Sequence, residues 1–116
     1  VVDEGVAQLL AADPPPTAIV VSTTAMGTHV LASLNDRGLR VPTDVSVVAY
    51  GQGEAAAQAR PRLSIVELPL KTIGRVVPEI IQRRLADPES SPLSLQIEAS
   101  WRPGASLGPV RGAGSA

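Results

Sequence analysis

The 116-residue sequence contains no cysteine and no phenylalanine, and Tyr50 and Trp101 are its only aromatic residues. Without cysteine the chain can form no disulfide, no thiolate metal site and no cysteine nucleophile. The hydrophobic core must therefore be built from Val, Ile, Leu and Ala side chains. Aromatic faces, which are common anchors in ligand pockets, are scarce here.

Basic residues are not clustered anywhere along the chain. The formal net charge is −1, Lys71 is the single lysine, and Arg83-Arg84 is the one adjacent basic pair. Nucleic-acid binding depends on clustered Lys and Arg side chains that neutralise phosphates. We therefore expect that this chain alone does not bind DNA, and we interpret Arg83-Arg84 as part of a solvated helix face.

The sequence also lacks the patterns of common catalytic and membrane segments. It contains no Walker-type lysine, no zinc cluster and no nucleophile elbow, and no apolar run of membrane-spanning length. The single histidine, His29, has no partner at a metal or triad spacing, so we expect it at the surface or in packing. These absences disfavour an enzyme and predict no catalytic residue, metal or cofactor. The chain opens within an apparent helix, with neither an initiator Met nor a signal-peptide pattern, which favours a fragment of a longer protein.

The hydrophobic pattern predicts helices alternating with strands. The strands are expected at 17–22, 44–50, 62–68 and 93–101; the helices are expected at 3–12, from the Ser22-Thr23-Thr24 segment to Gly38, and at 70–87, with a loop or short helix at 53–59. This order with short connections is typical of an α/β fold, an open and mainly parallel sheet with flanking helices.

Three local features lead to more specific expectations. The continuous apolar run in 17–22 predicts a strand covered on both faces. Pro78 predicts a kink or a break in the helix at 70–87. The composition of 103–116, rich in Gly, Pro and Ser, predicts a disordered tail after a domain formed by residues 1–102.

A family resemblance is carried by an ordered series of segments. The segment "RGLRVPTDVSVVAY" is the strongest match, and "PTAIVVS", "LSIVELPLKTIG" and "WRPGAS" accompany it in the expected order. Together, over roughly residues 1–108, they resemble the C-terminal part of the effector-binding domain of the lactose/galactose repressor (LacI/GalR) family. The resemblance implies the type I periplasmic-binding-protein-like fold, and specifically its C-terminal lobe.

The resemblance also implies a function. Members of that family are cytoplasmic transcription regulators, dimeric or larger, in which a small-molecule effector binds between two lobes. The effector changes DNA binding by an N-terminal helix-turn-helix, which this sequence does not contain. An alternative on the same fold is a lobe of the sugar-binding component of an uptake transporter, and fold alone does not separate the two. The sequence upstream of residue 1 would decide between a helix-turn-helix and a signal peptide.

Two strand ends supply candidate effector-binding residues: Ser22, Thr23 and Thr24 after the first strand, and Tyr50 and Gln52 at the end of the second. Ligands of open α/β sheets lie outside the carboxyl ends of the strands, so these residues should converge. The resembled family usually has Ser-Asn-Asp and Tyr-Asp-Asp at these places. Hydroxyls, Gly51 and an amide replace those groups here, which predicts an uncharged site with weak affinity for sugars.

Other roles remain open for the same residues. Ser22-Thr23-Thr24 is also a typical helix N-cap, and Tyr50 could simply close the end of the core. Trp101 is more typical of a packing anchor than of a stacking platform.

The resemblance further implies an assembly. It places a dimer contact near Thr28, Leu31 and Ala59, and it implies that the helix at 70–86 packs on a lobe that this chain lacks. We therefore expect a homodimer or a higher homo-oligomer, with no membrane association.

Overall fold

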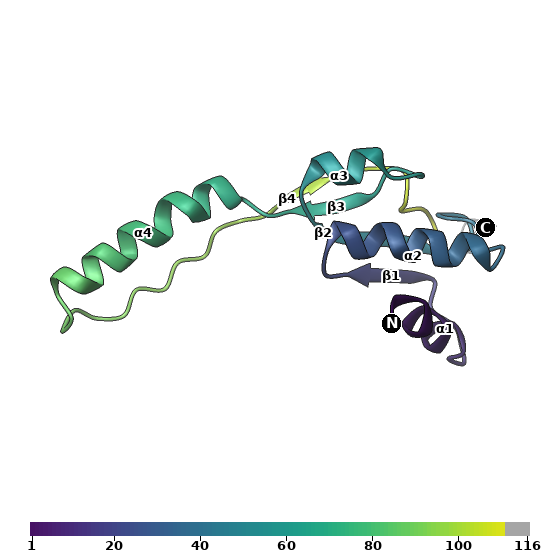
Figure 1. Cartoon of the computed structure of the whole chain (residues 1–116), viewed down its shortest axis with the longest axis horizontal. Coiled ribbons are helices and arrows are strands. Elements are labelled where there is room, and N and C mark those ends of the chain that lie inside the picture. The colour runs from purple at the N-terminus through teal and green to yellow at the C-terminus, as the bar shows by residue number, and fades with distance from the viewer. Residues whose placement is uncertain (111–116) are drawn as a thin grey trace. The chain divides into compact units, whose positions relative to one another are not determined.

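The computed structural model describes residues 1–110, and the chain forms two compact units. The first unit contains residues 1–67 and the chain from Trp101 onward, and the second contains residues 68–100. The elements in chain order are α1 (Val2–Leu10), β1 (Ala18–Val21), α2 (Thr24–Asp36), β2 (Ser46–Gly51), α3 (Gly53–Gln58), β3 (Ser64–Glu67), α4 (Leu70–Ala86) and β4 (Ser100–Arg102) (Figure 1). The expected order of elements is confirmed, and residues 53–58 form the short helix.

The sheet has the strand order β1-β2-β3-β4, and β1, β2 and β3 run parallel. Ile19 pairs in register with Val47, and Ala49 pairs with Ile65. The prediction of an open and mainly parallel sheet is therefore confirmed. A parallel arrangement brings the carboxyl ends of the three strands to one edge of the sheet.

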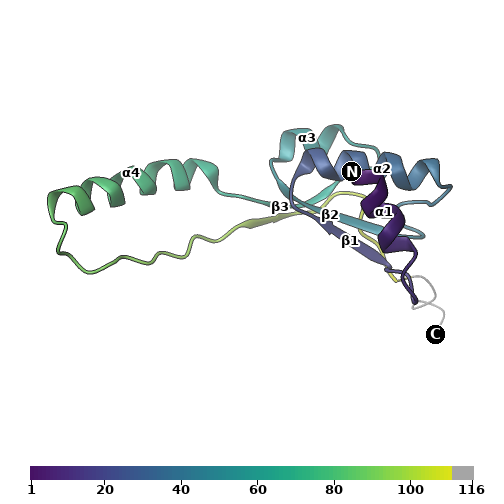
Figure 2. The same cartoon turned by 60° about the horizontal axis from the view of Figure 1, so that its bottom comes forward.

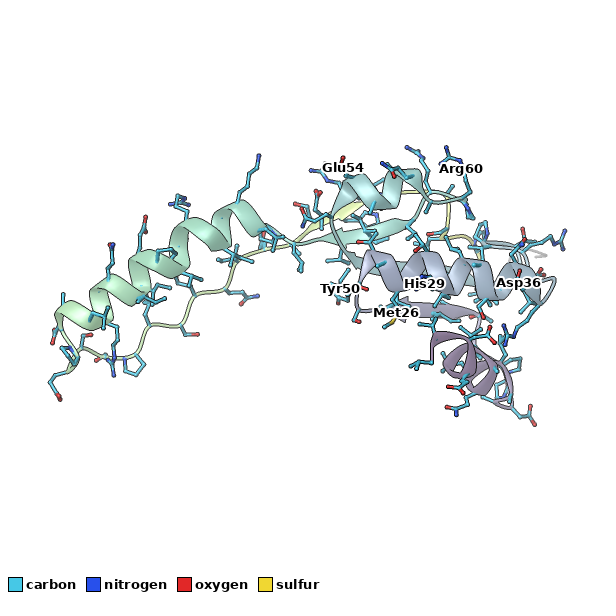
Figure 3. All side chains as sticks on the ribbon, viewed as in Figure 1. Met26, His29, Asp36, Tyr50, Glu54 and Arg60 are labelled. Carbon is cyan, nitrogen blue, oxygen red and sulfur yellow. The ribbon has the colours of Figure 1, made fainter. Side chains whose placement is uncertain are left out.

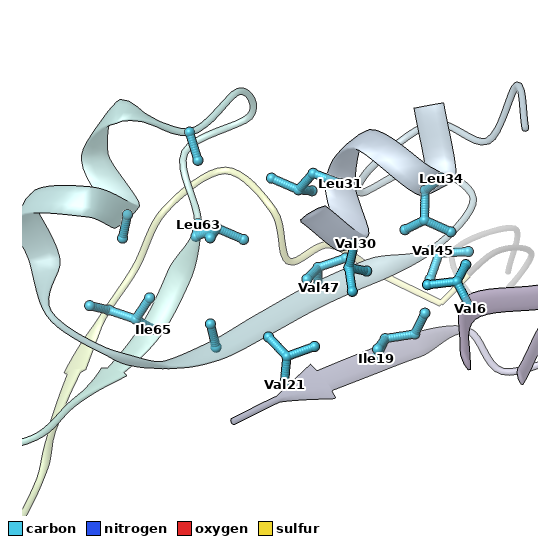
Figure 4. Packing of buried hydrophobic residues seen from close by; sticks show 13 residues of the cluster. Val6, Ile19, Val21, Val30, Leu31, Leu34, Val45, Val47, Leu63 and Ile65 are labelled. Carbon is cyan, nitrogen blue, oxygen red and sulfur yellow. The ribbon is translucent and has the colours of Figure 1, made fainter. Parts of the chain in front are cut away.

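The core lies between this sheet and the helices α1, α2 and α3, which share one side of it (Figure 2). Leu34, Val47 and Ala49 have no exposed surface, and Ile65 retains 1%. The buried cluster contains Val6, Ile19, Val21, Val30, Leu31, Leu34, Val45, Val47, Ala49, Ala56, Ala59, Leu63 and Ile65 (Figure 4). It consists of aliphatic side chains, as the composition predicts, and burial of each large one is worth about 1.5–3 kcal/mol.

The prediction that both faces of the first strand are covered is wrong for β1 within its unit. Burial alternates along the strand, so that Ile19 and Val21 are buried while Ala18 and Val20 are exposed. Successive side chains of a strand point to opposite faces, and no helix among the described residues of this unit covers the second face. Val20 therefore keeps 65% of its surface exposed.

The predicted disorder of the tail is wrong for residues 103–110. The Ser106 hydroxyl is buried, donates to the Val47 carbonyl at 2.5 Å and accepts the Ser64 N–H at 2.8 Å. Gly104 lies so close to the chain that a Cβ there would be 2.5 Å from the Arg62 carbonyl oxygen. These contacts, which composition does not reveal, hold the segment against β2 and β3. The remainder of the predicted tail, residues 111–116, lies outside the described residues.

Two expectations for the second unit are corrected in part. Of the kink or break predicted at Pro78, the break does not occur, because helix α4 continues through this residue; a proline removes only one hydrogen bond of the helix. The predicted last strand at 93–101 is reduced to Ser100–Arg102. Among the described residues, 93–99 pair with no strand, and an alternating pattern forms a strand only where a neighbour supplies hydrogen bonds.

The side chains of α4 remain partly or largely exposed. No residue of this helix is buried, and Val77, Ile81 and Leu85 are 44%, 53% and 75% exposed. Arg84 donates a hydrogen bond to the Ser90 carbonyl just after the helix. An apolar stripe of this kind favours contact with a further surface.

Candidate functional site

Seven residues gather where β1, β2 and β3 end, and we call them the strand-end edge. They are Ser22, Thr23, Thr24, Tyr50, Gly51, Gln52 and Glu67. The sheet register places Val21, the last residue of β1, beside Ala49, and it places Gly51 beside Glu67. The edge therefore combines polar groups from three neighbouring strand ends, as the parallel topology predicts.

Thr23 is the N-cap of α2. Its backbone is extended (φ −143°, ψ 154°), and its Oγ1 accepts the Met26 N–H at 3.1 Å. This bond satisfies one of the free amides of the first helical turn, so the N-cap interpretation is confirmed at Thr23. Thr23 and Ser22 are both exposed, and the Thr23 hydroxyl can still donate its own proton.

Thr24 and Gly51 fit against one another across the strand-end edge. Thr24 is only 7% exposed, and Gly51 has φ +148°, a conformation that residues with a side chain rarely adopt. A Cβ at position 51 would lie 2.1 Å from the Thr24 Oγ1. The aspartate that the resembled family usually has here cannot be accommodated in this backbone. The two departures from the family pattern, at 24 and at 51, are therefore physically linked.

Gln52 and Tyr50 present their side chains at the same edge. Gln52 occupies the N-cap position of α3 and is exposed; its Nε2 donates to the Gly51 carbonyl at 3.4 Å. Tyr50 is 43% exposed, so it does not close the core completely (Figure 3). Trp101, on β4, keeps 49% of its surface exposed.

Glu67 is the residue of this edge that the sequence interpretation missed. Its Oε2 accepts the Arg102 Nε–H at 2.6 Å, and its Oε1 accepts the Gly53 N–H at 3.2 Å. The Arg102 hydrogen bond is the main cause that lowers the pKa of Glu67; burial opposes it, and the Gly53 N–H and the Arg102 charge add to it. The edge thus also carries a carboxylate, which is paired with Arg102, and the uncharged effector site at Thr23, Thr24 and Gln52 stays a prediction. The strand-end rule applied to the strand at 62–68 could have identified this carboxylate.

The three residues predicted at a dimer contact lie around one groove. Thr28, Leu31 and Ala59 line a groove of about 690 Å³, together with Ala32, Asn35, Gly38, Leu39, Arg40, Val41, Arg60 and Pro61. Leu31 and Ala59 are 6% and 7% exposed, so they belong to its floor. The groove is on the α2 and α3 side of the unit, where Figure 3 labels Arg60 and His29, and His29 is exposed as expected.

Among residues 1–110, no group of three or more His, Cys, Asp or Glu side chains is arranged to hold a metal ion. In the described part of the chain, none of the helices combines the length and the apolar character needed to cross a bilayer.

The chain is similar to known transcription regulators over part of their length. Residues 1–107 match the model of the periplasmic binding protein-like domain. Catabolite control protein A of Priestia megaterium is 35% identical over 80 residues, which is 69% of this chain and 24% of that protein. The HTH-type transcriptional regulator CelR of Thermobifida fusca is 32% identical over 99 residues, 83% of this chain and 29% of that protein.

A solved structure agrees with these relatives. The structure of the transcriptional regulator CelR in complex with cellobiose matches 90% of this chain, and the match spans 32% of the CelR chain. The TM-score is 0.80 and the sequence identity is 28%. The chain thus spans about a quarter of the length of the curated relatives that it matches. The chain belongs to the periplasmic binding protein-like domain family.

Proposed function

We propose that this chain is the effector-sensing and oligomerisation part of a cytoplasmic transcription regulator of the LacI/GalR type. The family match over residues 1–107 is the observation that carries the proposal. The chain corresponds to about a quarter of such regulators, so DNA is contacted by a helix-turn-helix outside these residues. The near-neutral charge of this chain agrees with DNA contact by residues outside it. The chain itself catalyses no reaction.

The effector binds at the strand-end edge. The hydroxyls of Ser22 and Thr23 and the amide of Gln52 both donate and accept hydrogen bonds. This combination suits a neutral molecule rich in hydroxyls. The similarity to a regulator solved with cellobiose supports a sugar. Tyr50 contributes to the wall of the site, and the buried Thr24 shapes it by packing against Gly51.

Binding acts on DNA through a shift between conformations. The effector favours one arrangement of the effector-binding domain, and that arrangement changes the geometry of the DNA-binding segments. A second copy of the chain docks at the groove around Thr28, Leu31 and Ala59. The groove's apolar floor and its rim with Asn35, Arg40 and Arg60 resemble the composition of ordinary protein interfaces.

A sugar-binding component of an uptake transporter is the second candidate, because it shares the fold. The regulators among the relatives favour the first candidate. A helix-turn-helix encoded upstream of Val1 supports the regulator, and a secretion signal there supports the transporter.

Isothermal titration calorimetry tests the effector site. Cellobiose, lactose and ribose are titrated into the protein encoded by the complete reading frame and into the 116-residue chain. We expect the complete protein to bind one of these sugars, and Gln52→Ala to weaken that binding. The control Gln8→Ala changes an exposed glutamine of α1, far from the strand ends, and leaves the affinity unchanged.

Two results of this experiment contradict the proposal. The first is that none of the sugars binds to the complete protein, and the second is that Gln52→Ala has no effect. The short chain supplies only part of the cleft and should bind no tighter than about 1 mM, which corresponds to roughly 4 kcal/mol.

A further inference from the structure

Glu67 and Arg102 stand at the two places where the chain passes between its compact units. Glu67 is the last residue of the first unit before the chain enters the second, and the chain returns to the first unit at Trp101. Glu67 also ends β3, and Arg102 ends β4. The two side chains form an ion pair, with 2.6 Å between Arg102 Nε and Glu67 Oε2. One contact therefore joins the outgoing and the returning segments within the first unit.

The other oxygen of the same carboxylate is bound to the first residue of α3. Oε1 accepts the Gly53 N–H at 3.2 Å, and Gly53 follows Gln52 directly. A Cβ on Gly53 would lie 3.1 Å from this oxygen, so the carboxylate is seated closely against the backbone of the Gln52–Gly53 corner. The Glu67 side chain is 24% exposed, whereas that of Arg102 is 64% exposed.

We propose that Glu67 is a positioning residue that fixes the Gln52–Gly53 corner to both chain crossings. A carboxylate can do this because its two oxygens accept separate hydrogen bonds, one from a backbone amide and one from a guanidinium. A glutamine at the same place offers only one acceptor oxygen. The inference rests on the proposed function, because the position of Gln52 affects effector binding only if Gln52 contacts the effector.

Coupling follows from this arrangement. A change in the path of the chain at either crossing moves Glu67 or Arg102, and the Gly53 hydrogen bond transmits that movement to Gln52. In the reverse direction, an effector that holds Gln52 favours the geometry in which the ion pair is closed, because coupling between two sites is reciprocal.

Amide hydrogen exchange, followed by NMR on the 116-residue chain, tests the positioning role without any effector. Glu67→Gln should accelerate exchange of the Gly53 amide by about tenfold, the order expected when a hydrogen bond to a charged acceptor is lost. Arg102→Gln should accelerate this exchange by a smaller factor, because the Glu67 carboxylate keeps its hydrogen bond from the Gly53 amide but loses the one from Arg102. The matched control is Glu54→Gln, which removes an exposed carboxylate from the first turn of α3 and should leave Gly53 unchanged.

The outcomes separate this inference from the proposed function. An unchanged Gly53 rate in Glu67→Gln, or an equal change in Glu54→Gln, overturns the positioning role. If the Glu67→Gln variant does not fold, the Arg102→Gln variant provides the test. An unchanged exchange rate of the Gly53 amide in Arg102→Gln then overturns the positioning role of Glu67. In the complete protein, Glu67→Gln should weaken cellobiose binding while Glu54→Gln does not. If cellobiose, lactose and ribose all fail to bind but the exchange rates change as expected, the proposed effector is wrong and the positioning role of Glu67 is supported.

Discussion

Replacing Gly51 by alanine is the most direct perturbation of the contact between β2 and α2. The added Cβ would lie 2.1 Å from the Thr24 Oγ1 and 3.4 Å from its Cβ, and the backbone would keep φ +148°. A residue with a side chain in such a conformation costs about 1–3 kcal/mol, and overpacking costs a further ~1–3 kcal/mol. We therefore expect Gly51→Ala to destabilise the chain by about 2–6 kcal/mol.

Thermal unfolding followed by circular dichroism measures this effect. In a domain of this size, about 1 kcal/mol lowers Tm by roughly 4–8 °C, so the loss should be about 8 °C or more. Gly5→Ala is the control, since nothing lies within 4 Å of a Cβ at Gly5 in α1. That change should raise stability by about 0.5–1 kcal/mol, because alanine favours a helix more than glycine does.

A double variant separates the two causes. Thr24→Ala removes the hydroxyl that collides with the new Cβ but leaves the backbone conformation at position 51 unchanged. Gly51→Ala should therefore cost about 1–3 kcal/mol less in the Thr24→Ala background than in the wild type. An equal cost in both backgrounds, or a Gly51→Ala variant as stable as the wild type, would refute the contact and the reasoning built on it.

Four further predictions follow from the described residues. Leu34→Ala should lower the free energy of unfolding in urea by about 2–5 kcal/mol, because Leu34 has no exposed surface. The pKa of Asp3 is lowered by hydrogen bonds from Arg37 and Ser33, and that of Glu67 is lowered mainly by Arg102. Both carboxylates thus stabilise the fold above about pH 4, which is near their pKa values in the unfolded chain. This stabilisation should be lost as the pH falls through their lowered pKa values in the folded chain. Asp3→Asn should therefore reduce the loss of stability at acidic pH, which denaturant unfolding at a series of pH values measures. The chain should sediment as a dimer or larger species at tens of micromolar, and a clean monomer would contradict the groove assignment. Fluorescence anisotropy with duplex DNA at low salt should show no submicromolar binding by these residues, and tight binding that weakens steeply with salt would disprove this expectation.

The order of elements was predictable from sequence because each element has a strong local signal. The apolar runs around Ile19 and Val47 and the i, i+4 spacing of Val30 and Leu34 reflect the face that each element buries. The candidate site was also largely predictable, because strand ends of a parallel sheet meet at one edge wherever the strands themselves are identified.

The features that sequence did not reveal depend on contacts between distant segments. Ser106 is buried through bonds to Val47 and Ser64, which no composition count detects. Residues 93–99 have an alternating pattern but gain no partner strand among the described residues. The strand-end rule could have identified Glu67 itself, but its bonds to Gly53 and Arg102 join distant segments and could not be predicted.

Chemical-shift mapping with cellobiose is the measurement that tests the central claim most directly. NMR spectra of the 116-residue chain are recorded with cellobiose well above about 1 mM, where even the weak binding expected of a half-cleft is populated. The claim that the strand-end edge holds the effector predicts the largest amide shifts at residues 22–24 and 50–53. The absence of shifts at saturating sugar, or shifts concentrated around the groove at Leu31 and Ala59, would contradict it.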